Sequence, residues 1–156
     1  MRRLRLLWVT PNLPQRGIAA ARERWWALLA RLATRHDITL VALLDPEDAG
    51  VDPARVLPPG LAAVHTVAKA PWPPDDPLAL LPRTVRWGYA HPAFRAAVAE
   101  RLAADRLDLV QSEYTELDHV VPPTDVPTIL TVAQLGFAAP GPAWRAAGGG
   151  LASGAV

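Results

Sequence analysis

The chain has 156 residues, of which 51% are hydrophobic and 20% are charged, and this composition fits one globular domain large enough to bury a core. Its formal net charge of +1 argues against nucleic-acid binding, which normally needs a clear basic excess, and the absence of cysteine excludes disulfides and thiolate metal sites. No apolar run is as long as a membrane span, and the basic start leads into prolines without a signal-peptide cleavage site. We therefore expect a soluble, cytoplasmic protein.

A strand, a turn, a helix and a second strand are expected in the first third of the chain. Residues 4–10 and 37–44 form two nearly continuous apolar runs, which are typical of parallel strands covered on both faces. Prolines and Gly17 mark a turn after the first run, and apolar residues at helical spacing predict a helix over 18–35. The residues expected to face the core from this helix are Ile18, Trp25, Leu28, Leu29 and Leu32.

Strands and helices continue to alternate up to residue 137. The elements expected there are a short helical piece at 52–57, strands at 62–68, 107–111 and 127–132, a short helix at 78–89 inside the long connection 71–91, a helix at 92–104 and a short helix at 116–121. The helix at 92–104 should bury Phe94, Val98 and Leu102, and the pair Thr115 and Asp118 resembles a capping box. This alternation predicts an α/β fold with a Rossmann-like, doubly wound parallel sheet in a single domain.

The end of the chain has a different composition. Residues 137–156 contain five of the ten glycines and seven alanines, without an acidic residue. Such a segment cannot bury enough surface to offset its ordering entropy. We therefore expect a domain over 1–137 and a disordered Gly/Ala-rich tail over 138–156, which is alternatively the edge of a truncated gene product.

Candidate binding residues follow the first strand, because ligands of open parallel sheets bind beyond the carboxyl ends of the strands. Asn12 and Gly17 lie in the turn before the first helix, where glycine permits close backbone approach and the helix N-terminus favours an anion. Arg22 lies near the start of that helix and is a candidate for contacting a phosphate or a sugar hydroxyl. The alternatives are a turn that only connects two elements and an arginine whose stem extends out to solvent. The sequence has no GxGxxG and no P-loop lysine, so it supports neither dinucleotide nor classical NTP binding.

Glu113 and Tyr114 follow the expected fourth strand. A carboxylate beside an aromatic ring suits sugar binding, and a solvated strand end is the alternative. The four histidines show no metal-ligand spacing, so no metal site is expected, and His36 and His119 are predicted on the surface. No nucleophile elbow or Ser-His-Asp arrangement is visible.

The first helix is basic and carries tryptophan, which raises the question of membrane-surface binding. The side chains that would face anionic lipid headgroups in that case are Arg24, Arg31, Arg35 and Trp26. A solvated helix face is the competing interpretation.

The segments LRLLWVTPNLPQRG, RERWWALLARLATRHDITLVALL, DLVQSEYTEL and VPTILTVAQLGF occur in an order that resembles the N-terminal domain of GT-B glycosyltransferases of the glycosyltransferase 4-like kind. The resemblance covers roughly residues 3–137, with 50–90 similar only in layout. It implies a Rossmann-like domain that binds a sugar or lipid-linked acceptor, while a second domain binds the nucleotide-sugar donor and carries paired glutamates. No cofactor is implied for the domain itself.

Carried over residue by residue, the resemblance assigns Gly17 to the glycine after the first strand, Arg22 to a basic position on the first helix and Glu113 to the glutamate after the fourth strand. Family members often have a histidine after the fifth strand. Ala133 occupies that position here, so no residue of this chain can take the acceptor-side role assigned to that histidine. The 156 residues contain no donor domain, so we expect the chain alone to be inactive because both domains must position the reactants.

Several interpretations of the function stay open. The first is an acceptor-side glycosyltransferase domain that is truncated or split from its donor-domain subunit. It would be located in the cytoplasm and would contact the inner face of the membrane weakly. The second is a non-catalytic domain that docks on a separate subunit. A fragment of a degraded gene is the third, and a nucleotide-dependent oxidoreductase comes last because its glycine fingerprint is missing.

Overall fold

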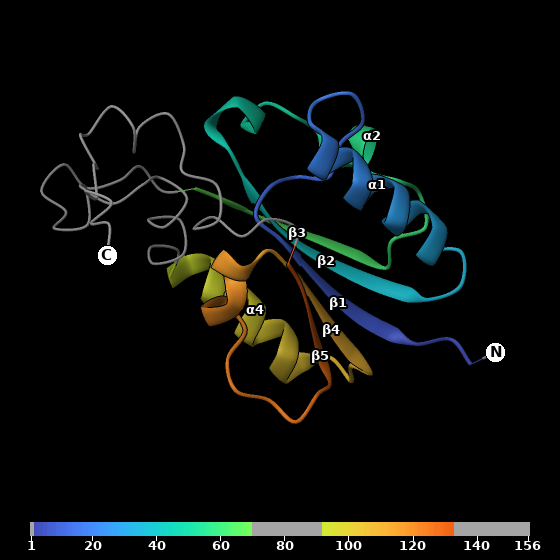
Figure 1. Cartoon of the computed structure of the whole chain (residues 1–156), viewed down its shortest axis with the longest axis vertical. Helices are drawn as coiled ribbons and strands as arrows, with labels where there is room; N and C mark the ends of the chain where they lie inside the picture. Colours follow the sequence, from blue (N-terminus) through green and yellow to red (C-terminus); the bar gives the residue numbers. More distant parts are fainter. Residues whose placement is uncertain (1, 70–91, 133–156) are drawn as a thin grey trace, which may run out of the picture.

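The computed structural model describes residues 2–69 and 92–132. They form one sheet of five parallel strands in the order β3-β2-β1-β4-β5, with helices on both faces (Figure 1). The strands are β1 (Arg5–Thr10), β2 (Asp37–Leu44), β3 (Ala63–Ala68), β4 (Leu109–Glu113) and β5 (Thr128–Thr131). The helices are α1 (Ala20–Leu32), α2 (Pro53–Val56) and α4 (Pro92–Ala104), with the 3-10 turns η1 (Pro46–Asp48) and η3 (Thr115–Val120).

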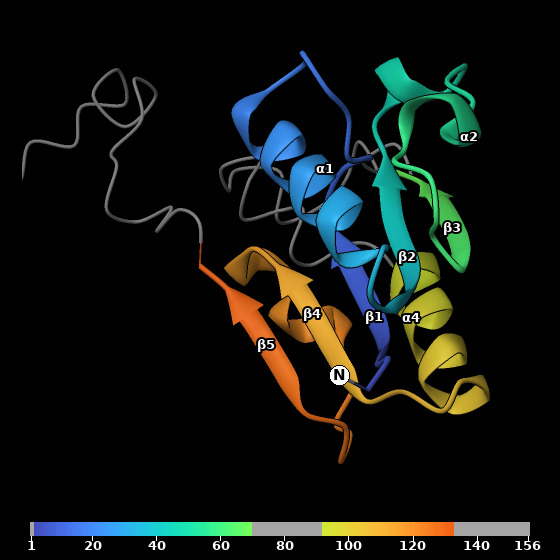
Figure 2. The ribbon, with the colours of Figure 1, turned by 90° about the vertical axis from the view of Figure 1, so that its right-hand side faces the viewer.

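The sheet is doubly wound, as the sequence predicts. Helices α1 and α2 lie over one face, and α4 and η3 (yellow-green and orange) lie over the other (Figure 1). The chain steps outward from β1 to β2 and β3, and later returns to place β4 on the opposite side of β1 (Figure 2). The fold is therefore Rossmann-like, and β1 is its central strand.

Two hydrophobic clusters hold the layers together. Alternate residues of β1 point to opposite faces, so Leu6 and Trp8 join the cluster beneath α1, and Leu7 and Val9 join the cluster beneath α4. The first cluster also contains Leu13, Leu29, Ala33, Ile38, Leu40, Ala42 and Leu57. The second also contains Val41, Leu43, Phe94, Val98, Val110, Leu117 and Val120. Strands buried on both faces explain why the sequence shows continuous apolar runs rather than alternation.

The first helix begins later than predicted. Gly17 has φ 72° and Ala19 is extended, so α1 starts at Ala20. Ile18 lies outside the helix with 58% of its surface exposed, and its assignment to the core is wrong. The reason is that the left-handed turn at Gly17 separates Ile18 from the helical repeat that buries Trp25 and Leu29.

Strand β4 is shifted by two residues from its prediction. It begins at Leu109 and ends at Glu113, because its ladder with β5 continues until Glu113 pairs in register with Thr131. Glu113 thus belongs to the strand rather than following it. The 3-10 turn η3 begins at Thr115, so Tyr114 rather than Thr115 occupies its cap position, and the expected helix start at 116 is one residue late.

The other boundaries agree well with their predictions. The bounds of β2 and α4 match the expected 37–44 and 92–104, and β1, β3 and β5 lie within their predicted ranges. His119 is exposed as predicted, whereas His36 is buried and its Nδ1 accepts a hydrogen bond from the Leu4 N–H at 3.3 Å. The helix expected at 78–89 and the tail at 138–156 lie outside the described residues. No helix within the described ranges is long and apolar enough to cross a membrane.

Candidate functional site

The topology places a candidate site at the carboxyl edge between β1 and β4. These strands are neighbours, but the chain leaves β1 toward the face of α1 and leaves β4 toward the face of η3 (Figure 1). Ligands of open α/β sheets bind at such a switch point, because the diverging connections open a crevice there. The side chains around this edge form two groups, and both include residues of α1.

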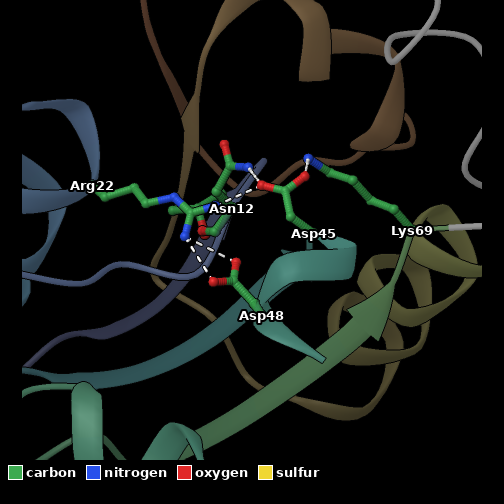
Figure 3. Close-up of polar contacts among 6 residues, drawn as sticks. Asn12, Arg22, Asp45, Asp48 and Lys69 are labelled. Atoms are coloured by element: carbon green, nitrogen blue, oxygen red, sulfur yellow. Dashed lines mark hydrogen bonds and ion pairs between the residues drawn. The ribbon is translucent and has the colours of Figure 1, made fainter. Parts of the chain in front are cut away.

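The first group is a buried charge network centred on Asp45, which directly follows β2 (Figure 3). One carboxylate oxygen, Oδ1, accepts from Lys69 Nζ at 2.5 Å, and the other, Oδ2, accepts from Arg22 Nη2 at 2.5 Å. Asn12 Nδ2 also donates to Oδ2. The network therefore joins the ends of β1, β2 and β3, because each strand is followed by one of its members.

Asp48 completes the network. Arg22 Nη1 lies 2.9 Å from Asp48 Oδ2, so the guanidinium is held between the two aspartates (Figure 3). The side chains of Arg22, Asp45, Asp48 and Lys69 are all about nine-tenths buried, and two positive charges balance two negative charges. Arg22, which the sequence analysis proposes as a contact for a ligand, is thus bound by two carboxylates of the protein itself.

The pKa of Asp45 lies below its ordinary value of 3.8. Burial alone would raise this pKa, but the hydrogen bond and the charge of Lys69, the charge of Arg22 and the hydrogen bond from Asn12 outweigh that effect. Asp45 therefore remains ionised in the folded protein at pH values where an unfolded chain would begin to protonate it.

This lowered pKa predicts a specific loss of stability in acid. A group whose pKa is depressed by folding stabilises the protein above its unfolded pKa, and this contribution is lost as the pH falls through the folded pKa. We expect the free energy of unfolding to fall with pH below about pH 4, and less steeply in Asp45→Asn than in the wild type. Urea unfolding between acidic and neutral pH measures this, and equal slopes in the two proteins would contradict it.

The second group is centred on Glu113, whose side chain is fully buried. Its Oε2 accepts from Arg24 Nη2 at 2.6 Å and from the Trp25 indole Nε1 at 3.0 Å, and its Oε1 accepts from Gln111 Nε2 at 3.3 Å. Three donors therefore fix the carboxylate. Glu113 positions α1 against β4 at the switch point, and in this conformation it does not face solvent.

Tyr114 follows Glu113 and has an unusual backbone. Its φ is 81° and its ψ is 139°, a combination that side chains other than glycine rarely adopt, and it is the only non-glycine residue with positive φ among those described. Its ring meets the Trp25 ring edge-on, with centroids 5.6 Å apart and planes at 78°. Such strained residues concentrate at functional sites, where the surrounding structure maintains them.

A pair of substitutions separates the strain at Tyr114 from its ring contact. Tyr114→Ala removes the contact with Trp25 and keeps the positive φ, whereas Tyr114→Gly removes both the contact and the strain. We expect the glycine variant to be more stable than the alanine variant by about 1–2 kcal/mol. Chemical denaturation measures this difference, and an alanine variant of equal or greater stability would show that the position is unstrained.

Gly17 contributes through its backbone conformation. Its φ is 72°, and a Cβ added there would meet no described atom within 4 Å. The glycine is therefore explained by the left-handed turn rather than by a close approach to a neighbouring residue. That turn directs the chain from β1 into α1.

The structure thus divides the predicted site residues. Asn12 and Arg22 belong to the Asp45 network, and Glu113 and Tyr114 form the second group. The sequence analysis missed the residues that hold these groups together, namely Asp45, Asp48, Lys69, Arg24 and Trp25. One signal was present: Lys69 is the single lysine in a chain with fifteen arginines. No cluster of potential metal ligands is found in 2–69 and 92–132.

The residues proposed to face lipid are partly engaged within the protein. Arg24 pairs with Glu113, and Trp26 donates from its indole Nε1 to the Val56 carbonyl at 2.8 Å. The Arg16 guanidinium also lies 3.6 Å from the centroid of the Trp26 ring. Contacts within the protein therefore explain the positions of two of the four side chains, Arg24 and Trp26, and no contact with a membrane is needed for them.

Comparisons with known proteins support the fold. No protein-family model matches the sequence, and no curated protein matches it. Among solved structures, the chain is similar to the C-terminal domain of a hydrogenase from Pyrococcus furiosus, with a TM-score of 0.53 and 14% identity, over 85% of this chain and 95% of that chain. At this identity the similarity shows the α/β fold alone.

Proposed function

We propose that this chain is the acceptor-binding domain of a two-domain GT-B glycosyltransferase. The observation that carries the proposal is the group at the switch point, where the buried Glu113 carboxylate holds Trp25 against Tyr114. An aromatic ring at a carboxyl edge, here that of Tyr114, is suited to stacking on the apolar face of a sugar ring. The resemblance of the sequence segments to that family points in the same direction.

The geometry assigns different roles to the candidate residues. Tyr114 is the residue for contacting the sugar, and Glu113 is a positioning residue because its oxygens are already bonded to the protein. Asn12 and Arg22 hold the loop after β1 through Asp45, and Gly17 sets the turn of that loop. The acceptor edge would thus be rigid before any ligand binds, which lowers the entropic cost of binding.

The catalytic contribution of such a domain is positioning. A second domain would bring the nucleotide-sugar donor to the acceptor, and the rate gain would come from holding the two reactants in one geometry. We propose a sugar or a lipid-linked sugar as the acceptor, and a cytoplasmic location that includes weak contact with the inner face of the membrane. Transfer would not require a metal or a cofactor on this domain.

Saccharide titrations test the proposal. We expect neutral monosaccharides to bind the ¹⁵N-labelled chain at millimolar concentration and to shift the Trp25 indole N–H signal, whereas nucleotide sugars should not bind this edge. Tyr114→Ala should abolish the shift, and Trp26→Phe, a change on the next residue of α1, should preserve it. The proposal fails if no saccharide perturbs Trp25, or if nucleotide sugars bind there instead.

A second candidate function is docking onto a separately encoded subunit. Ile129 of the edge strand β5 is 49% exposed, and Val132 just beyond it is 51% exposed. Exposed aliphatic side chains along a sheet edge favour association with another chain. Sedimentation at increasing concentration, with a pull-down from the native host, tests this; a strict monomer that captures no partner would count against it.

A further inference from the structure

The cation available for a ligand at the switch point is Arg24 rather than Arg22. Arg22 lies between Asp45 and Asp48, with its side chain 11% exposed. Arg24, two residues later on α1, reaches the end of β4 and is 39% exposed, although the carboxylate that it contacts is fully buried. The two arginines therefore differ in whether solvent can reach them.

The contacts of Arg24 leave most of its guanidinium available. Its Nη2 donates to Glu113 Oε2 at 2.6 Å, and we find no second acceptor for the guanidinium within the described part of the chain. A guanidinium carries five N–H donors, so four remain. Glu113 also accepts from Trp25 and Gln111, so its position does not depend on Arg24 alone.

This arrangement prepares a cation for an oxyanion. The carboxylate fixes the direction of the guanidinium, whose planar donors match the oxygens of a phosphate in a bidentate manner. Because Glu113 precedes Tyr114 and both contact α1, the cation and the aromatic ring belong to one neighbourhood. An anionic group beside a stacked sugar would thus meet both.

We propose that Arg24 binds a phosphate group carried by the acceptor, so that the acceptor is a phosphorylated saccharide, either soluble or linked to a lipid through its phosphate. This inference rests on the proposed function. It predicts that the domain prefers a sugar phosphate to the parent sugar, and that the preference depends on the guanidinium.

Titration with glucose, glucose 6-phosphate and inorganic phosphate tests the inference on the whole chain. We expect glucose 6-phosphate to bind about tenfold more tightly than glucose, and Arg24→Gln to remove this preference. Arg31→Gln, an exposed arginine two turns along the same helix, should preserve it.

The other outcomes are decisive as well. If glucose binds but its phosphate adds no affinity, or if Arg24→Gln keeps the preference, the inference fails and the proposed function stands. If inorganic phosphate binds as tightly as glucose 6-phosphate and glucose does not bind, the anion site stands and the acceptor function fails.

If Arg24→Gln does not fold, Arg24→Lys keeps the charge but not the bidentate geometry, and an undiminished preference would overturn the inference. Flotation with phosphatidylcholine vesicles that carry polyprenyl-phosphate-linked glucose separates a lipid-linked acceptor from a soluble one.

Discussion

Asp45→Asn is expected to lower the free energy of unfolding by about 3–5 kcal/mol, because breaking a buried ion pair leaves its partner charges uncompensated. The amide has the same shape as the carboxylate, but it removes the negative charge that faces Arg22 and Lys69. Its N–H groups would also face the donors of Asn12 or Lys69 in place of an acceptor. Urea denaturation monitored by tryptophan fluorescence measures the loss.

Asp37 provides a matched control at the other end of the same strand. It is the first residue of β2, it pairs with Arg3 at 2.6 Å, and both side chains are about half exposed. Exposed ion pairs contribute little, so Asp37→Asn should cost less than about 1 kcal/mol. Similar costs for the two variants would show that burial of the Asp45 network does not determine its contribution.

Trp25→Ala is expected to cost about 3–5 kcal/mol, because it empties the space of a large, fully buried side chain. The substitution also leaves Glu113 without one of its donors and Tyr114 without its ring contact. We therefore expect the unfolding transition to shift and saccharide binding to disappear together. Denaturation and NMR titration of the same sample measure both effects.

Trp25→Phe separates the hydrogen bond from the packing. It retains an aromatic ring, removes the indole N–H that donates to Glu113 and reduces the ring volume, so we expect a cost of about 1–3 kcal/mol. Trp26→Phe removes a comparable donor, whose acceptor is the neutral Val56 carbonyl, and should cost less. A larger loss of stability in Trp26→Phe than in Trp25→Phe would contradict the expectation that losing a donor to the buried Glu113 carboxylate costs more than losing a donor to a neutral carbonyl.

The fold could be read from the sequence because its signals are local. The apolar run at β2 and the proline-initiated helix α4 carry their boundaries within a few neighbouring residues, so both ranges were predicted correctly. The end of β4 could not be read in this way. Glu113 is polar, and only its pairing with Thr131 keeps it in the ladder.

The partners of the site residues could not be predicted, because they are distant in the sequence. Arg22 meets Asp45 across 23 residues, and Arg24 meets Glu113 across 89. Helical periodicity places Arg22 on the apolar face with Trp25 and places Arg24 on a neighbouring stripe, but it does not show which carboxylates each arginine meets. The strand order and the rotation of α1 on the sheet decide that.

By itself, the sequence determined the class of fold and the edge at which a site should form, because hydrophobic periodicity and the alternation of strands and helices follow from residues close along the chain. Tertiary structure alone decided that Arg22 is enclosed by Asp45 and Asp48 while Arg24 remains partly exposed beside Glu113. It also decided that Ile18 faces solvent. The physical reason is that burial and ion pairing depend on which distant segments the sheet register brings together.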